Sequence, residues 1–399
     1  MDLLLSVGRV LSSPKDDPIF DCAILIRDKI ITAIGPRSDV AALASPDASR
    51  LDYPSSTALP GLINAHVHLA FDASPDPITT LASSDDDSLL TGMATRARYL
   101  LQAGVTTTRD LGDVGGLAAR LRDEINAGRQ HGPRILAATI PLTIPGGHCH
   151  FLGGEVDGVN EIRAMVRRNA SRGADLIKVM ASGGQFTPTG PAMWESQFSA
   201  AELCAAVDEA HRLGLPVAAH AHGTDAIAAA VAAGVDTIEH CTWLTEGFRS
   251  DPREDIASQI VARGIFVCIG LGPGWWAFAE RLGPERAETM FNRLRWMRDQ
   301  GIRLIIGTDA GLPGSAFNDF VSALELYEYV GFNRSQILEM ATTGAASALG
   351  LSGRTGRLAI GYDADLIVVD GDPVAELNAL RKLQMTVARG RTSFFNPNR

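Results

Sequence analysis

The feature that most constrains the fold of this chain is a run of eight short apolar segments that alternate with amphipathic helical stretches. Strands that alternate with helices in this way are typical of βα units, which build a parallel sheet. Eight units within about 250 residues have the size of one closed (β/α)8 barrel. We expect the strands at residues 61–69, 104–109, 134–142, 174–180, 216–221, 237–242, 266–270 and 303–308.

Glycine follows several of the intervening helices, which include the Ala-rich stretches 200–213 and 225–233. Gly at this position favours a left-handed helix cap, and we expect such caps at Gly173, Gly214, Gly234, Gly264 and Gly301. A doubly wound open sheet would show the same alternation, but no GxGxxG sequence follows the first strand of the repeat. We therefore predict an α/β fold with a (β/α)8 TIM barrel.

Both ends of the chain are strand-rich and helix-poor. Residues 23–31 alternate around an Asp-Lys turn, and residues 356–370 and 385–388 alternate in the same way. We predict that the two ends meet in a small β-sandwich domain. Its parts would be residues 1–58 and 351–399, on either side of a metal-dependent hydrolase barrel at 59–350.

Composition excludes several classes of protein. With a net charge of −10 and no basic stretch, the chain is not expected to bind nucleic acid or an anionic membrane. No apolar run reaches the roughly 18 residues that span a bilayer, and the opening MDLLLSVGRV is expected to be a strand and not a signal peptide. An odd, unpatterned set of cysteines favours reduced thiols in the cytoplasm; they are Cys22, Cys149, Cys204, Cys241 and Cys268.

Most of the nine histidines fall at the carboxyl ends of the expected strands or just beyond them. In a barrel these ends form the rim on which active sites are built. Only His131 and His211 fall in or beside helices. The clustering of the other seven predicts a site at the rim: His66, His68, His148, His150, His220, His222 and His240.

His66 and His68 are two residues apart on the first strand, so both imidazoles face the same side and could bind one metal. Hydrogen-bonded core histidines would show the same spacing. Lys178 lies in an apolar run, where a bare ammonium is costly. It therefore needs either a carboxylate partner or carboxylation by CO2, which would make an anionic oxygen ligand.

His220, His240 and Asp309 end the fifth, sixth and eighth strands. With His66, His68 and Lys178 they give six potential ligands at corresponding heights of the barrel. Any one of the six has a structural explanation, but their convergence predicts a metal site.

These motifs resemble the amidohydrolase superfamily, in the binuclear subtype with a bridging carboxylated lysine. The resemblance covers nearly the whole chain and is closest to the imidazolonepropionase-like branch, which includes Xaa-Pro dipeptidases, related carboxypeptidases and ochratoxin-type amide hydrolases. True imidazolonepropionases use one metal and have an acidic residue soon after the fifth-strand histidine, whereas Gly223-Thr224 follows His222 here. The similar segments are PGLINAHVH (60–68), GHCH (147–150), KVMASGG (178–184), HAHG (220–223) and GRLAIGYDADL (356–366).

The resemblance implies two divalent cations, expected to be Zn²⁺, that are bridged by a CO2-derived carboxylate on Lys178 and by the attacking hydroxide. The first ion would be held by His66, His68 and Asp309, and the second by His220 and His240. Asp309 would carry the hydroxide proton to the leaving nitrogen. His222 would stabilise the oxyanion or make a structural hydrogen bond.

Three further residues are candidates for substrate binding. His148 and His150 follow a glycine-led loop and would line the pocket or satisfy backbone groups. Arg109 would bind a substrate carboxylate bidentately or form an internal ion pair with Asp110 or Asp113. Loop tryptophans are compatible with pocket walls and with a homo-oligomer, and the sequence leaves both open.

We expect a hydrolase that cleaves the C–N bond of a small-molecule amide, in particular an N-acyl or N-aminoacyl amino acid, as a dipeptidase or carboxypeptidase does. A cyclic amide, lactam or carbamate hydrolase of the same mechanism is the alternative. A single-metal deaminase fits less well because Lys178 is present. A non-catalytic scaffold fits less well because all six expected ligands are present.

Overall fold

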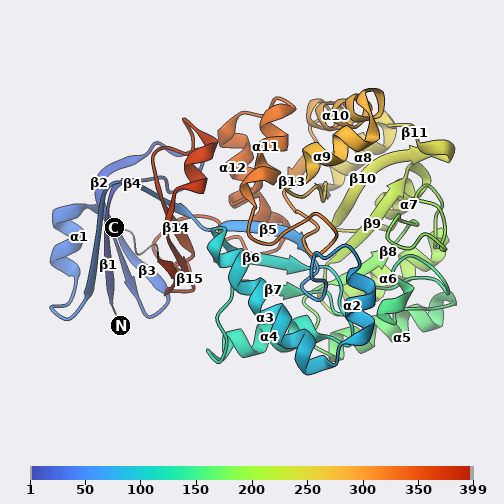
Figure 1. Ribbon diagram of the computed structural model, residues 1–399, viewed down its shortest axis with the longest axis horizontal. Coiled ribbons are helices and arrows are strands. Elements are labelled where there is room, and N and C mark those ends of the chain that lie inside the picture. The colour runs from blue at the N-terminus through green and yellow to red at the C-terminus, as the bar shows by residue number, and fades with distance from the viewer. Residues whose placement is uncertain (1, 396–399) are drawn as a thin grey trace.

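A computed structural model describes residues 2–395. Residue 1 and residues 396–399, the outermost ends of the expected β domain, lie outside the described residues. Within this range the middle of the chain forms eight strands that pair in parallel with their neighbours (Figure 1), and the predicted α/β fold with parallel strands is confirmed. The strands are β5 (Leu62–Val67), β6 (Val105–Asp110), β7 (Arg134–Ala137), β8 (Ile177–Met180), β9 (Val217–Gly223), β10 (Thr237–Thr245), β12 (Phe266–Cys268) and β13 (Arg303–Ile305).

Helices connect these strands, and the helices expected at 200–213 and 225–233 are present as α6 (Ala200–Arg212) and α7 (Thr224–Ala233). The five glycines expected to cap helices have positive φ angles between 69° and 83°, as a left-handed cap requires. The helices are α2 (Pro77–Ser83), α3 (Asp86–Gln102), α4 (Leu117–Asn126), α5 (Gly158–Ser171), α6 (Ala200–Arg212), α7 (Thr224–Ala233), α8 (Glu254–Arg263), α9 (Trp275–Leu282), α10 (Pro284–Asp299), α11 (Val321–Tyr329), α12 (Arg334–Met340) and α13 (Thr343–Ala348), with short 3₁₀ turns at His150–Leu152, Glu246–Phe248 and Leu377–Arg381.

The parallel strands lie in two sheets, in the orders β5-β6-β7 and β8-β9-β10-β12-β13, and the short strand β11 (Arg249–Ser250) pairs antiparallel with β10. Single parallel bridges join the two sheets at both edges. Leu142 pairs with Val179 of β8, and Ala310, beyond β13, pairs with Val67 of β5. The backbone amide of Asp309 also donates to the carbonyl of His66 at 2.9 Å.

Strand β7 is shorter than the expected segment 134–142. Thr139 has a φ of 60°, outside the range of a strand, and Pro141 has no amide hydrogen to donate. The segment rejoins the sheet at Leu142, which donates to the carbonyl of Lys178 at 2.9 Å. The interruption explains why β7 and β8 belong to different sheets.

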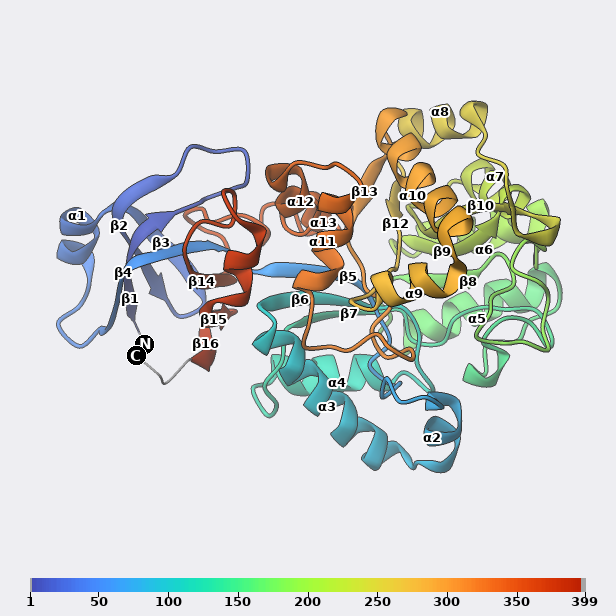
Figure 2. The ribbon, with the colours of Figure 1, turned by 45° about the horizontal axis from the view of Figure 1, so that its top comes forward.

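The two ends of the chain form a separate seven-stranded sheet, which Figure 2 shows beside the parallel strands. Its order is β16-β15-β14-β4-β1-β2-β3, so the expected sandwich is one connected sheet. Alternate residues of its strands face a common core, while Leu4, Ala23 and Leu25 face helix α1 (Arg37–Leu43) instead. The strands are β1 (Leu3–Val10), β2 (Ile19–Arg27), β3 (Ile30–Pro36), β4 (Ser49–Pro60), β14 (Leu366–Asp370), β15 (Leu383–Ala388) and β16 (Arg391–Phe395).

Two further expectations concern the whole chain. Among residues 2–395, no helix combines the length and the hydropathy of a bilayer-spanning segment. All five cysteines are free thiols, as their scattered spacing predicted.

Candidate functional site

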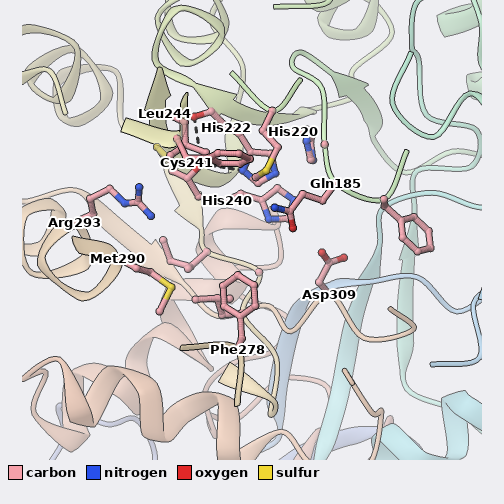
Figure 3. A pocket seen from close by; sticks show the side chains of 18 of the residues that line it. Gln185, His220, His222, His240, Cys241, Leu244, Phe278, Met290, Arg293 and Asp309 are labelled. Carbon is pink, nitrogen blue, oxygen red and sulfur yellow. Dashed lines mark hydrogen bonds between the residues drawn. The ribbon is translucent and has the colours of Figure 1, made fainter. Parts of the chain in front are cut away.

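A cavity of about 760 Å³ opens where the carboxyl ends of the parallel strands converge (Figure 3). This volume lies within the range of small-molecule pockets, about 300–1,000 Å³. The cavity brings together most of the predicted site residues from six different strands or strand ends. Those that line it are His66, His68, His148, Lys178, His220, His222, His240 and Asp309.

The first group within the cavity consists of His66, His68 and Asp309. The Oδ1 atom of Asp309 lies 3.2 Å from Nε2 of His66 and 3.3 Å from Nε2 of His68. Neither contact has hydrogen-bond geometry, and Oδ1 is buried without a hydrogen-bond partner among the described residues. One ligand atom from each residue lies within 4.8 Å of the others, so three electron-pair donors face one another.

The opposite nitrogen of each of these two rings contacts an acceptor. His68 Nδ1 lies 3.0 Å from the Gly112 carbonyl, and His66 Nδ1 lies 3.0 Å from Glu239 Oε2, at an angle poor for a hydrogen bond. An acceptor beside Nδ1 favours the tautomer that carries its proton on Nδ1. The lone pair of Nε2 is then free to bind a metal. Burial opposes a charge on His68, but Asp309 outweighs it and raises the pKa of this imidazole.

The second group consists of His220, His222 and His240, which also lie within 4.8 Å of one another through one ligand atom each. Burial lowers the pKa of His240 to about 3 and lowers the pKa values of His220 and His222 well below the ordinary value. All three imidazoles are therefore neutral at pH 7, the form that binds metals. Sequence reasoning placed His222 outside the ligand set, whereas the geometry groups it with the other two.

Lys178 of β8 is only 1% exposed and lines the same cavity. Its ammonium makes no ion pair or hydrogen bond with any residue in the described range, so the carboxylate-paired alternative is not observed. Burial lowers the pKa of this amine, although Glu239 and Asp309 exert an opposing Coulombic effect. Burial thus raises the share of the neutral amine, which is the form that can react with CO2, above that of an exposed lysine.

Unusual backbone angles accompany these side chains. His240 and Asp309 have φ angles of 66° and 54°, in a region that non-glycine residues seldom adopt and that often marks functional sites. A Cβ atom on Gly307 would lie 2.4 Å from the Cβ of His66. The absence of a side chain at Gly307 thus allows the end of β13 to approach β5 and brings Asp309 to the histidines.

The two histidines of the expected substrate loop lie in different surroundings. His148 lines the cavity and contacts His220 in a tilted ring pair with centroids 4.5 Å apart, and its buried Nδ1 has no partner among residues 2–395. Burial lowers its pKa to about 4. His150 is not among the cavity-lining residues and its ring contacts Phe151 instead, so the expected role of His150 in substrate binding has no support.

Arg109 is not available to a substrate. Its guanidinium is buried away from the cavity and donates to the carbonyl of Ala65, the hydroxyl of Thr237 and Oε1 of Glu239 at 2.7–2.9 Å. The ion-pair alternative is therefore observed, with Glu239 in place of Asp110 or Asp113. The proposed substrate-binding role for Arg109 is wrong because the side chain points inward from β6 and not beyond its end.

Glu239 is a residue beside the first donor group that sequence reasoning missed. Its carboxylate is fully buried between Arg109 and His66, and its pKa lies well below the ordinary value because Arg109 and His66 outweigh the effect of burial. The available signal was a glutamate inside an expected strand, directly before His240. A buried carboxylate needs a partner, and a metal-binding histidine needs an acceptor.

Comparison with known proteins gives a consistent assignment. The family model described as "Amidohydrolase family" matches residues 57–392. Ochratoxinase of Aspergillus niger is 28% identical over 404 aligned residues, covering 92% of this chain and 81% of that protein. Imidazolonepropionase of Bradyrhizobium sp. (strain BTAi1) is 27% identical, covering 92% of each. The crystal structure of an Xaa-Pro dipeptidase with methionine bound in its active site is 25% identical, covers 99% of this chain and 100% of that chain, and has a TM-score of 0.85.

Proposed function

The chain belongs to the amidohydrolase family, and we propose that it hydrolyses a small-molecule amide with the aid of two divalent cations, zinc in the first instance. The observation that carries this proposal is the convergence of two donor groups and a buried, unpaired lysine on one cavity. The proposed substrate is an N-acyl or N-aminoacyl amino acid. Ochratoxinase and an Xaa-Pro dipeptidase are among the similar proteins.

We also propose that the eight parallel strands form one closed (β/α)8 barrel. The bridges Leu142–Val179 and Val67–Ala310 connect the two sheets at both edges, and strand order follows chain order around them. Closure explains how strands β5 and β13, at opposite ends of the repeat, contribute to one site. The small β domain at residues 1–58 and 351–399 flanks this barrel in our proposal.

The residues present fit two cations. Imidazole nitrogens and a carboxylate oxygen are ordinary zinc ligands. Asp309 Oδ1 lies close to the two Nε2 atoms without a hydrogen bond to either, and a cation bound by all three atoms would stabilise this arrangement. His66, His68 and Asp309 would hold one ion, and His220 and His240 the other. Carboxylation of Lys178, in which the amine adds to CO2 and releases a proton, would supply an anionic oxygen to both.

The chemistry supplied by such a pair of ions is activation of water near neutral pH and polarisation of the substrate carbonyl. Asp309 would accept the proton of the attacking water and return it to the nitrogen that leaves, so that the C–N bond breaks. His222 would donate to the oxyanion or complete the second ligand group. His148 has a free nitrogen with which to orient the substrate.

The direct test is metal analysis of the purified protein together with a hydrolysis screen of dipeptides, N-acyl amino acids, lactams and carbamates. We expect two metals per chain and turnover of N-acyl or N-aminoacyl amino acids. Turnover confined to lactams or carbamates would replace the proposed substrate class but keep the mechanism. A protein with two metals that hydrolyses none of these compounds would contradict the proposal.

Lys178→Ala tests the bridging ligand independently of substrate. We expect the variant to lose one metal and most activity, and short carboxylic acids to restore part of both. Lys29→Ala, at an exposed position in the β2–β3 turn, serves as the control and should retain both metals. If Lys178→Ala keeps two metals and normal turnover, Lys178 is not a ligand.

A further inference from the structure

Arg293 is a partly buried arginine whose charge has no partner among the described residues. It belongs to α10, lines the cavity, and makes no hydrogen bond or ion pair with any residue in the described range. Burial lowers its pKa to about 10, which still leaves it charged at neutral pH. Figure 3 shows its guanidinium pointing toward His240 and Cys241, with Asp309 on the far side of the histidines.

Two arginines that are buried more deeply than Arg293 both have acidic partners. Arg109 pairs with Glu239 at 2.7 Å, and Arg134 pairs with Asp363 and Asp365 at 2.7 and 2.9 Å. A guanidinium that loses part of its hydration normally finds such partners, because burial of an unpaired charge is unfavourable. Arg293 has not even a backbone carbonyl as an acceptor among residues 2–395.

Arg293 lies on the apolar face of its helix. Met290, Leu294 and Met297 lie on the buried face of α10, and residue 293 falls on the same stripe at helical spacing. Helix packing alone would favour an apolar residue there. The arginine therefore presents a cation to the cavity from a face that is otherwise hydrophobic.

Nearby groups do not supply the missing negative charge. Within the described lining of the cavity the only acidic side chains are Asp309 and Glu285. Asp309 faces His66 and His68, and Glu285 lies eight residues away on α10, about 12 Å along the helix axis.

We propose that Arg293 binds the carboxylate of the substrate, and that the residue bearing this carboxylate is an apolar amino acid. A carboxylate matches the planar guanidinium and would pair with it through two hydrogen bonds. Met290, Leu294, Met297, Leu244 and Phe278 line the same cavity and would surround an apolar side chain. The inference rests on the proposed amide hydrolysis for its substrate, and Arg293 takes the role that sequence reasoning gave to Arg109.

The test compares two substrates that differ only in the carboxylate, N-benzoyl-L-leucine and N-benzoyl-3-methylbutylamine. We expect the wild-type enzyme to prefer the acid, and Arg293→Met to reduce that preference about 10- to 100-fold, as loss of a charge-assisted hydrogen bond does. The loss should fall mainly on KM, because the carboxylate is held in the ground state as well as in the transition state. Arg293→Lys should restore part of the preference.

Arg295→Met is the matched control, since Arg295 is on the same helix, pairs with Glu288 at 2.7 Å and is not among the cavity-lining residues. It should leave the preference unchanged. Binding of the product L-leucine, measured by calorimetry, gives a second readout that needs no turnover, and Arg293→Met should weaken it by a similar factor.

The two proposals can fail separately. If both compounds are hydrolysed equally well, and Arg293→Met alters neither hydrolysis nor leucine binding, the carboxylate site is overturned while the amide hydrolase remains. If no amide is hydrolysed but leucine binds in an Arg293-dependent manner, the anion site remains and the proposed function is overturned. If Arg293→Met fails to fold, Arg293→Lys is compared with the wild type instead. An unchanged preference for the acid in Arg293→Lys would then overturn the carboxylate site.

Discussion

A carboxylate that faces two imidazoles must be held there by the backbone around it, and Asp309 has such support. Its φ of 54° is a left-handed conformation, and its amide donates to the carbonyl of His66. The His66 and His68 contacts hold the pKa of Asp309 well below its ordinary value despite burial. The side chain is therefore an anion at neutral pH and is available to accept a proton.

Replacement of Asp309 by asparagine removes this proton acceptor but keeps the shape of the side chain. We expect kcat to fall by about 10²–10⁴-fold, the usual contribution of a general acid–base group, while much of the metal is retained. Metal content and thermal unfolding of Asp309→Asn, measured beside the kinetics, separate chemistry from misfolding. A kcat within a few-fold of the wild type would exclude Asp309 as the proton carrier.

His148 offers a pH-dependent test in the metal-free protein. Burial lowers its pKa in the folded protein to about 4, below the ordinary value of 6.5. Between these pH values the unfolded chain binds a proton that the folded chain does not, so the contribution of His148 to stability declines as pH falls from 6.5 toward 4.

We therefore expect the stability difference between wild type and His148→Asn to shrink as pH is lowered, by up to about 1.4 kcal/mol per pH unit. Denaturant unfolding of both proteins at several pH values between 7 and 4 measures the difference. A constant difference across this range would show that His148 is protonated equally in both states.

At the scale of elements, the parallel strands are tied together across their interior by charge as well as by hydrogen bonds. Arg109 of β6 reaches Thr237 and Glu239 of β10, a strand that is not its neighbour in the sheets. Glu239 Oε2 in turn lies 3.0 Å from Nδ1 of His66 of β5. The ion pair thus links three strands and the first ligand group.

Arg109→Met should lower the free energy of unfolding. The substitution leaves the carboxylate of Glu239 buried without its cation, which typically destabilises a protein by about 3–5 kcal/mol. Denaturant unfolding measures the loss, and the double variant Arg109→Met/Glu239→Gln should recover part of it. Arg120→Met, which breaks an exposed pair with Asp87, should cost less than about 1 kcal/mol; equal costs for the two arginines would contradict a structural role for the buried pair.

At the scale of the whole molecule, the terminal sheet is anchored to the parallel strands by apolar packing and by charge. Ile367 and Val369 of β14 belong to the main hydrophobic core, whereas Leu366 and Val368 face the core of the terminal sheet. Arg134 of β7 pairs with Asp363 and Asp365 just before β14. Strand β14 therefore contributes to both cores.

Because the proposed ions bind ligands from five different strands or strand ends, their removal should destabilise the whole molecule. A ligand present at 1,000 times its dissociation constant stabilises the folded state by about 4 kcal/mol. We expect chelation to lower the Tm by several degrees and added zinc to restore it. The His66→Ala/Asp309→Ala variant is the control and should respond less; a Tm that is indifferent to verified metal removal would contradict the fit of the site to two ions.

The sequence alone was sufficient for features set by local periodicity and by the ends of strands. The eight strands, the glycine caps and the two-ended β domain follow from alternation and turn residues, which act within a few positions of one another. The convergence of His66, Lys178, His220, His240 and Asp309 was also predictable, because parallel strands place their carboxyl ends on one side of the fold.

What only the tertiary structure decided is where side chains point when distant segments compete for them. Arg109 and Arg293 are both arginines, and the sequence does not show that Glu239, 130 positions away, captures the first. Arg293 is left without a partner because α10 turns it toward the cavity. Periodicity fixes the face of an element on which a side chain lies, but its partner depends on which other elements pack against that face, and packing is a property of the whole chain.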